Sequence, residues 1–335
     1  MVTALEQAFI ASVAKAQGVR QPRSATSEWT AAFVQRLREL GWIDGHNVAI
    51  EYRWSEGRAE RFVQIAAEFV RLKVDVIVTS GTPQALATKQ ATSVIPIVFA
   101  RVGNPVANGL VASLGRPGGN VTGLSSQTDE LAGKRLELLR EVVPSLRRVA
   151  ILANVDNPFS VMELGEAQAA ARTLGLEFDA LEIRRAEDIA PAFEAIKGRT
   201  QALYVCPDGL VDANKIRINT SALGARLPTM HGYREYVEGG GLMSYGAKLP
   251  DMYGRAADYV DKILHGAKPG DIPVEQPTKF DLIVDRQGAR PRAFADAACS
   301  GTRNHRIAAL FAALHMAAFG TKRTSQRSLM FVRFR

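Results

Sequence analysis

The sequence predicts an α/β fold with two doubly wound lobes, each built on a parallel sheet. Predicted strands alternate with predicted helices from residue 27 to residue 284, a pattern typical of parallel sheets with helices on both faces. The alternation starts afresh near residue 148. The chain has 335 residues, 47% of them hydrophobic, and this length favours two domains of about 150 residues each.

The first half opens with a helix on which Trp29, Phe33, Leu37 and Leu40 recur at helical spacing. The turn "GWIDGHN" ends this helix. The elements that follow are the strand "VAIEYRW", a helix marked by Phe62, Ile65, Phe69 and Val70, the buried strand "VDVIVTS", the strands "IPIVFA" and "VTGLSS", and a helix from about Asp129 to Val143.

The second half repeats this rhythm. Its predicted strands are "RVAILAN", "LEFDALEI", "QALYVCP" and "GGLMSYG". The helices between them are "PFSVMELGEAQAAARTLG", "AEDIAPAFEAIKG" and "VDANKIRINTSALGARL". We therefore expect a second sheet of the same type as the first.

The loop after "VDVIVTS" holds the first candidate binding residues, Ser80, Gly81 and Thr82. Ligands of doubly wound sheets bind beyond the carboxyl ends of the strands. Thr82 is predicted as the N-cap and Pro83 as the first helical residue. The free N–H groups near Gln84 and Ala85 would then bind an anion such as a carboxylate. The alternative is an ordinary turn that caps the helix and has no function.

Similar short polar groups follow other predicted strands. The candidate binding residues among them are Asn104, Thr122, Asn154, Pro207, Asp208 and Tyr245. Each is compatible with simple turn chemistry, but their recurrence in both halves favours a shared cleft. Asp208 is a candidate partner for an ammonium group, and Tyr233 or Tyr245 for stacking on an aromatic ligand.

No signature of catalysis or of a cofactor stands out. Ser80 lies in "TSGTP" rather than in a G-x-S-x-G elbow, and no glycine-rich phosphate loop follows a strand. Cys206 and Cys299 lack the spacing of metal ligands. We expect no enzymatic activity, no cofactor and no metal.

The positive charge lies at one end of the chain. The net charge is +8, but residues 286 to 335 hold ten Lys and Arg and one acidic residue, Asp296. The remaining chain is close to neutral, which argues against nucleic acid as a partner. No stretch reaches the ~20 apolar residues of a membrane span. The N-terminal segment, with Glu6 and Gln7 inside its apolar region, is not a convincing export signal.

Several long segments resemble one family. They are "AAFVQRLRELGWIDGHNVAIEYRWSEGR", "IPIVFARVGNPVANGLVASLGRPGGNVTGLSS", "GKRLELLREVVPSLRRVAIL", "GGLMSYG" and "AADYVDKILHGAKPGDIPVEQPTKFDLIV". Over about residues 25 to 284 the chain is similar to the substrate-binding proteins of ABC importers related to the tryptophan- and tyrosine-type binding proteins.

The resemblance implies a type I periplasmic-binding-protein fold, in which crossover hinges join two Rossmann-like lobes. Lobe 1 would comprise 27–120 and about 247–272, and lobe 2 would comprise 121–246 and about 273–284. The family's cleft loops map onto the nine candidate residues named above. The implied ligand is an amino acid or a related small molecule. The implied partners are the permease and ATPase of an ABC importer, and the implied form is a periplasmic monomer.

Both ends depart from the family. Family members have a signal peptide and then a first strand resembling "IGFL", and we expect no such strand in 1–26. After "FDLIV" the chain reads "DRQGARPRAFADAACSGTRNHR", so 285–335 is expected to be an atypical basic tail that packs poorly. A frameshifted or misannotated end and a lineage-specific extension both fit this tail. Two alternatives to import stay open: a cytoplasmic ligand sensor of the same fold, and a degenerate, non-functional copy.

Overall fold

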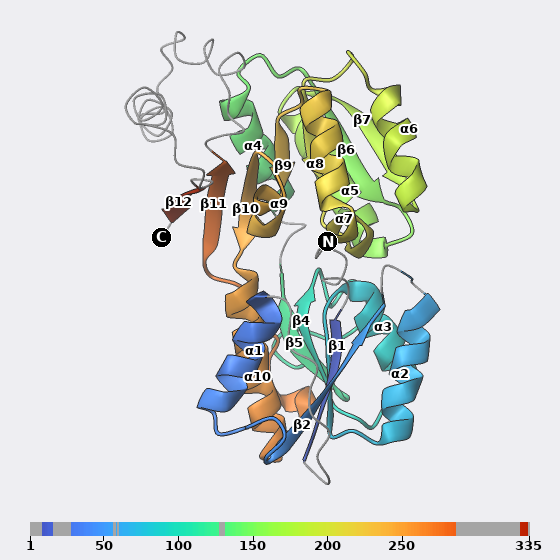
Figure 1. Cartoon of the computed structure of the whole chain (residues 1–335), viewed down its shortest axis with the longest axis vertical. Helices are drawn as coiled ribbons and strands as arrows, with labels where there is room; N and C mark the ends of the chain where they lie inside the picture. The colour runs from blue at the N-terminus through green and yellow to red at the C-terminus, as the bar shows by residue number, and fades with distance from the viewer. Residues whose placement is uncertain are drawn as a thin grey trace.

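A computed structural model describes residues 9–15, 28–55, 58, 60–126, 131–285 and 329–333. These residues form two lobes, one around a five-stranded sheet and one around a seven-stranded sheet (Figure 1). The strands are mostly parallel and alternate with helices. The predicted fold class is therefore confirmed.

The sheet of the first lobe has the order β2-β1-β3-β4-β5. Its strands are β1 (Phe9–Lys15), β2 (Val48–Trp54), β3 (Val76–Thr79), β4 (Ile97–Val102) and β5 (Val121–Ser125). β3, β4 and β5 run parallel, and every residue of β3 and β5 is buried, as expected for strands covered on both faces. This sheet includes β5, so it extends to Ser125, beyond the boundary that we expected at residue 120.

The expectation that 1–26 contains no strand is wrong. β1 lies between β2 and β3 and pairs with both in the antiparallel direction. The segment "FIASVAK" carries Phe, Ile and Val, which favour strands. Backbone hydrogen bonds to β2 and β3 then stabilise this short strand, which would not be stable by itself.

Helices cover the first sheet from two sides. They are α1 (Glu28–Glu39), α2 (Glu60–Leu72), α3 (Thr82–Ala91) and α10 (Leu249–Leu264). α1 packs on α10, and α2 packs on α3 at the other side of the sheet (Figure 1). α1 buries Thr30, Phe33 and Leu37, which lie on one face at helical spacing.

The second sheet has the order β12-β11-β10-β9-β8-β6-β7. Its strands are β6 (Arg148–Asn154), β7 (Glu177–Ile183), β8 (Ala202–Val205), β9 (Thr229–His231), β10 (Met243–Ala247), β11 (Phe280–Asp285) and β12 (Leu329–Arg333). β11 and β12 are antiparallel to their neighbours. The expectation of a poorly packed tail therefore fails for 329–333, which forms the sheet edge; residues 286–328 lie outside the described residues.

The helices of the second lobe are α4 (Ala132–Val142), α5 (Pro158–Thr173), α6 (Ile189–Ala195), α7 (Gly209–Ala213), α8 (Lys215–Gly224) and α9 (Arg234–Glu238). Single 3-10 turns, η2 (Ala186–Asp188) and η3 (Pro269–Asp271), precede α6 and follow α10. The helix predicted over "VDANKIRINTSALGARL" is two helices. The break falls at Asn214, whose side chain donates to the carbonyl oxygen of Leu210 at 2.8 Å.

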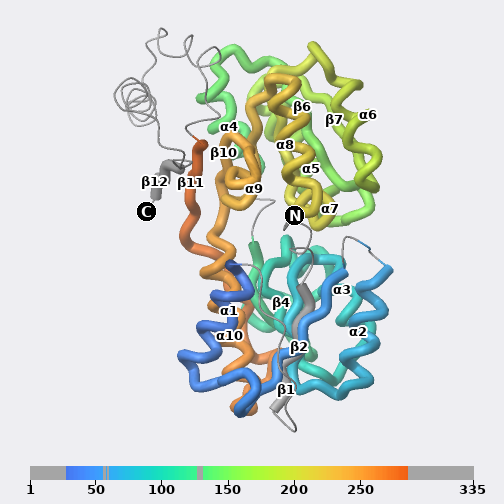
Figure 2. Tube along the Cα trace, in the orientation of Figure 1, coloured from blue at the N-terminus to red at the C-terminus, as the bar shows by residue number. Residues whose placement is uncertain are grey.

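The chain crosses between the lobes in both directions. β5 belongs to the first lobe and α4 to the second; β10 leads down into α10, and the segment after α10 leads back to β11 (Figure 2). These crossings bring loops from distant parts of the sequence to one interface.

Candidate ligand-binding site

A cleft with an empty volume of about 1160 Å³, including space open to solvent, lies between the lobes. The ends of β2, β3 and β4 contribute its first-lobe wall, and the loops after β6 and β8 contribute the second-lobe wall. A concave site between two lobes is a usual position for a small organic ligand. The predicted site residues that line it are Ser80, Gly81, Thr82, Asn154, Pro207 and Asp208.

The loop between β3 and α3 is held in a conformation that requires glycine. Gly81 has φ 95°, and a Cβ atom there would lie 2.4 Å from Oε1 of Gln84. The N–H of Gly81 donates to the carbonyl oxygen of Arg101 at 2.8 Å. The hydroxyl of Tyr253 donates to Oγ of Ser80 at 2.5 Å. The loop is thus fixed by β4 and α10 before any ligand arrives.

The predicted cap at Thr82 is wrong. Gly81 occupies the N-cap position and no side chain caps α3. The N–H of Ala85 donates to the carbonyl oxygen of Gly81, so it is not free for a ligand. Oγ1 of Thr82 and Oγ of Ser55 are buried at the cleft without a hydrogen-bond partner among the described residues. Buried hydroxyls without partners are costly, so both suit contacts with a polar ligand group.

Asp208 organises the loops of the second lobe. As N-cap of α7 it accepts from the N–H of Leu210 at 2.6 Å. It also accepts from Nδ2 of Asn154 at 3.0 Å and from Nδ2 of Asn157 at 2.7 Å. Burial raises the pKa of Asp208 although these donors oppose the shift. Its Oδ1 accepts most of these bonds, so Oδ2 keeps capacity for one further donor.

Aromatic side chains give the cleft an apolar part. Trp54 and Phe62 come from the first lobe and Phe159 from the second. The ring of Phe159 packs on Gly103, where a Cβ atom would lie only 1.9 Å from Cδ2 of that ring. The two lobes therefore touch directly at this side of the cleft.

Arg101 is a cleft residue that the sequence reasoning missed. Its guanidinium lies 5.6 Å from the ring centroid of Trp29 and 5.1 Å from that of Tyr233, within range of cation–π attraction. Burial acts to lower its pKa, but the carboxylate of Asp212 and the hydroxyls of three nearby tyrosines together outweigh burial, and the pKa is raised. Nη1 has no partner among the described residues. A single charge inside the strand "IPIVFARVG" was the signal that could have revealed it.

The structure places three predicted site residues away from the cleft. Oδ1 of Asn104 accepts from the N–H of Ala107, as in a simple turn. Thr122 is buried in β5 and donates to the carbonyl oxygen of Ile272 at 2.7 Å. The ring of Tyr245 lies 6.0 Å from that of Phe280 and packs on the core of the second lobe. Strand ends alone could not show which side chains face inward.

Within the part of the chain that the structure describes, no group of three or more His, Cys, Asp or Glu could hold a metal ion. Among the same residues, no helix is both long and apolar enough to cross a membrane.

Comparisons with known proteins agree on one family. The family model described as "ABC transporter substrate binding protein" matches residues 17–293. A tyrosine-binding protein of Clostridioides difficile (strain R20291) is 28% identical over 253 residues, which cover 76% of this chain and 73% of that protein.

Solved structures show the same similarity. A conserved domain protein from Vibrio cholerae matches with a TM-score of 0.74 and 29% identity, over 82% of this chain and 94% of that chain. An ABC domain from Streptococcus pneumonia in complex with L-Trp matches with a TM-score of 0.72 and 24% identity, over 78% and 88%. The ligand-free, open structure of a substrate-binding protein with adhesive properties from Clostridium difficile matches with a TM-score of 0.58 and 26% identity, over 83% and 92%.

Proposed function

Because the chain belongs to the family of ABC transporter substrate-binding proteins, a family of binding proteins and not of enzymes, we propose that it binds an aromatic amino acid for an ABC importer. The observation that carries this proposal is the composition of the cleft, in which polar loops from both lobes adjoin an aromatic wall. The relatives named for tyrosine and bound to L-Trp support the ligand class.

The carboxylate of the ligand is assigned to the first lobe. Donors without partners among the described residues gather there: the hydroxyls of Ser55 and Thr82 and Nη1 of Arg101. The N-terminus of α3 adds a favourable dipole. These groups would replace the water molecules that solvate a free carboxylate.

The ammonium group and the side chain are assigned to the rest of the cleft. Oδ2 of Asp208 accepts one hydrogen bond in the structure and would accept a second from the ammonium group. The aromatic ring would lie among Trp54, Phe62 and Phe159. Offset or edge-to-face ring contacts add about 0.5–1.5 kcal/mol beyond buried area.

Such a ligand would contact both lobes at once and so favour the closed arrangement over an open one. The permease of the importer would then recognise the closed form on the outer side of the membrane, where members of this family typically act, and the ATPase would drive transport from the inner side.

Titration calorimetry and thermal shift test this proposal. We expect L-tryptophan or L-tyrosine to raise the melting temperature, because a ligand that binds only the folded state stabilises it. Indole-3-propionate, which lacks the ammonium group, and tryptamine, which lacks the carboxylate, should each bind at least about tenfold more weakly. A folded preparation that responds to no aromatic amino acid would refute the assigned ligand class.

A further inference from the structure

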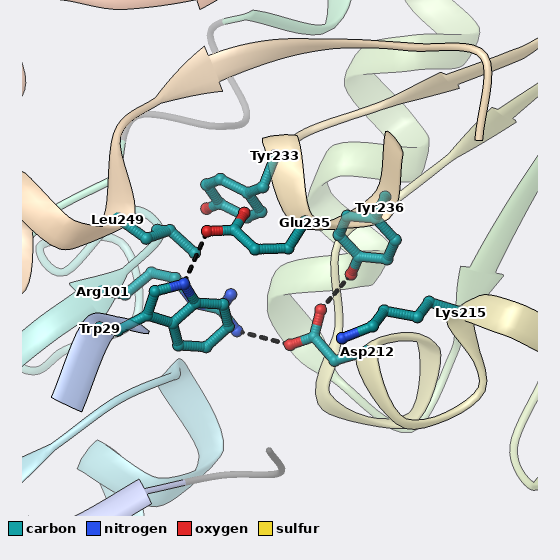
Figure 3. Close-up of a pocket in the computed structure, with 8 residues that line it drawn as sticks. All are labelled: Trp29, Arg101, Asp212, Lys215, Tyr233, Glu235, Tyr236 and Leu249. Atoms are coloured by element: carbon teal, nitrogen blue, oxygen red, sulfur yellow. Dashed lines mark hydrogen bonds and ion pairs between the residues drawn. The ribbon is translucent and has the colours of Figure 1, made fainter. Parts of the chain in front are cut away.

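A cluster of side chains beside the cleft joins the two lobes directly (Figure 3). Trp29 of α1 and Arg101 of β4 come from the first lobe, and Asp212 of α7 and Glu235 of α9 from the second. Nε1 of Trp29 donates to Oε1 of Glu235 at 2.6 Å. Nη2 of Arg101 lies 2.9 Å from Oδ2 of Asp212. Two polar contacts between charged or aromatic groups therefore span the interface without any ligand atom.

The ion pair is shielded from water. The side chains of Arg101 and Asp212 are 12% and 13% exposed. Trp29 and Tyr233 lie over the guanidinium, and the hydroxyl of Tyr236 donates to Oδ1 of Asp212. Ion pairs at the surface are worth little, whereas a shielded pair is attracted more strongly and leaves a costly uncompensated charge when it is broken.

The carboxyl of Glu235 is enclosed at the lobe contact, where it accepts from Trp29 of the opposite lobe. Burial raises its pKa to about 7, above the ordinary value of 4.5, and the Trp29 hydrogen bond and Arg101 oppose this shift. The charged or titratable groups that face it are Arg101 of β4, Asp212 of α7, Lys215 of α8, Tyr233 and Tyr236 beside it, and Glu238 on its own helix. Leu249, where the chain enters α10, completes its apolar cover.

We propose that Trp29, Arg101, Asp212 and Glu235 form an interlobe latch, and that closing this latch takes up a proton at Glu235. Opening would separate Trp29 and Arg101 from the second lobe and expose the Glu235 carboxyl to water. The latch would act with or without a ligand, so it goes beyond the proposed function.

The sign of the pH effect follows from linkage. A group with a higher pKa in the closed form binds its proton more tightly there, so low pH favours closure. The contribution is complete below the ordinary value of 4.5 and is lost as the pH rises through about 7. Between about pH 5 and about pH 8 the ratio of closed to open protein should fall at least about tenfold.

Small-angle X-ray scattering of the ligand-free protein tests the latch without reference to any ligand. The radius of gyration of the wild type should increase as the pH rises. The Glu235→Gln variant carries a permanently neutral side chain and should stay compact at every pH. Trp29→Phe removes the indole donor and should expand the protein throughout. Glu166→Gln, exposed on α5 of the same lobe and outside this cluster, is the matched control and should behave as the wild type; circular dichroism verifies that each variant is folded.

Calorimetry adds a second readout, which rests on the proposed function. The Kd for L-tryptophan or L-tyrosine should rise at least about tenfold over the same pH range in the wild type but not in Glu235→Gln. The α-carboxyl and α-amino groups of the free ligand do not titrate in this range, so they do not produce the effect. If neither amino acid binds, the assigned ligand class fails and scattering alone decides on the latch. A wild type whose size is independent of pH, or a Glu235→Gln variant with the pH dependence of the wild type, would overturn the proposal.

Discussion

At the scale of the residue, the cleft contains side chains that already form hydrogen bonds within the protein and side chains that form none. Ser80 accepts from Tyr253, and Asp208 accepts from four N–H donors of its own lobe. Thr82, in contrast, buries a hydroxyl without a partner among the described residues. Side chains that are already hydrogen-bonded hold the cleft in its shape. Side chains without a partner can gain a hydrogen bond when a ligand binds, so they can contribute to affinity.

Thr82→Val tests this distinction, because valine keeps the shape and removes the hydroxyl. Affinity for the amino acid should fall about tenfold, the value of roughly one hydrogen bond to a charged group. The free energy of unfolding should not fall, since the lost hydroxyl bonds nothing in the free protein. Thr79→Val is the matched control: its Oγ1 is equally buried and unpartnered but does not line the cleft. Equal loss of affinity in both variants would contradict the assigned contact.

At the scale of the element, strands can be predicted from the sequence where the apolar pattern is strong. The buried runs "VDVIVTS" and "RVAILAN" become β3 and β6, because uninterrupted β-branched and apolar residues suit strands covered on both faces. The prediction fails at "FIASVAK". The apolar pattern of this segment is weak, and it forms a strand because its backbone pairs with β2 on one side and β3 on the other. Prediction also fails for Tyr245 and Thr122, because a sequence shows where a strand ends but not which face of the sheet meets the cleft.

A buried ion pair secures the helices that carry the second-lobe loops. Arg135 of α4 and Glu163 of α5 are fully buried, with Nη1 and Oε1 2.7 Å apart, and the hydroxyl of Tyr204 in β8 donates to the same Oε1 at 2.7 Å. Nε of Arg135 donates to the carbonyl oxygen of Tyr245 at 2.8 Å. This network ties two helices to β8 and β10.

Glu163→Gln should therefore lower the free energy of unfolding by roughly 3–5 kcal/mol, because the charge of Arg135 stays buried without its counter-ion. Denaturant unfolding measures this change. Adding Arg135→Met should recover part of the loss by removing the uncompensated charge. Glu166→Gln, exposed on the same helix, is the control. If Glu163→Gln lowers the free energy of unfolding no more than Glu166→Gln does, the Arg135–Glu163 pair is not important for stability.

At the scale of the whole molecule, function depends on how closely the lobes approach. The latch lies at one part of the interface, and Phe159 packs on Gly103 at another. Both contacts use residues that also line the cleft. Closure and ligand binding are therefore expected to be coupled through the same side chains.

Gly103→Ala tests this coupling with the smallest possible change. The backbone of Gly103 is outside the left-handed region, so alanine adds no backbone strain, but its Cβ atom would lie 1.9 Å from the Phe159 ring of the opposite lobe. The ring must shift or the lobes must stay further apart. We expect calorimetry to show at least a tenfold loss of affinity for the amino acid, about 1.4 kcal/mol, while the free energy of unfolding changes by less than about 1 kcal/mol.

Gly165→Ala is the control for this variant. It lies on α5, the helix that carries Phe159, and its Cβ atom would meet nothing within 4 Å. Alanine there should stabilise the helix by up to about 1 kcal/mol and leave affinity unchanged. Adding Phe159→Ala to Gly103→Ala removes the clash and should restore compaction on ligand addition, as measured by small-angle scattering. Gly103→Ala with the affinity and compaction of the wild type would mean that the Phe159 contact does not limit closure, because the ring would then have moved aside at no cost to binding.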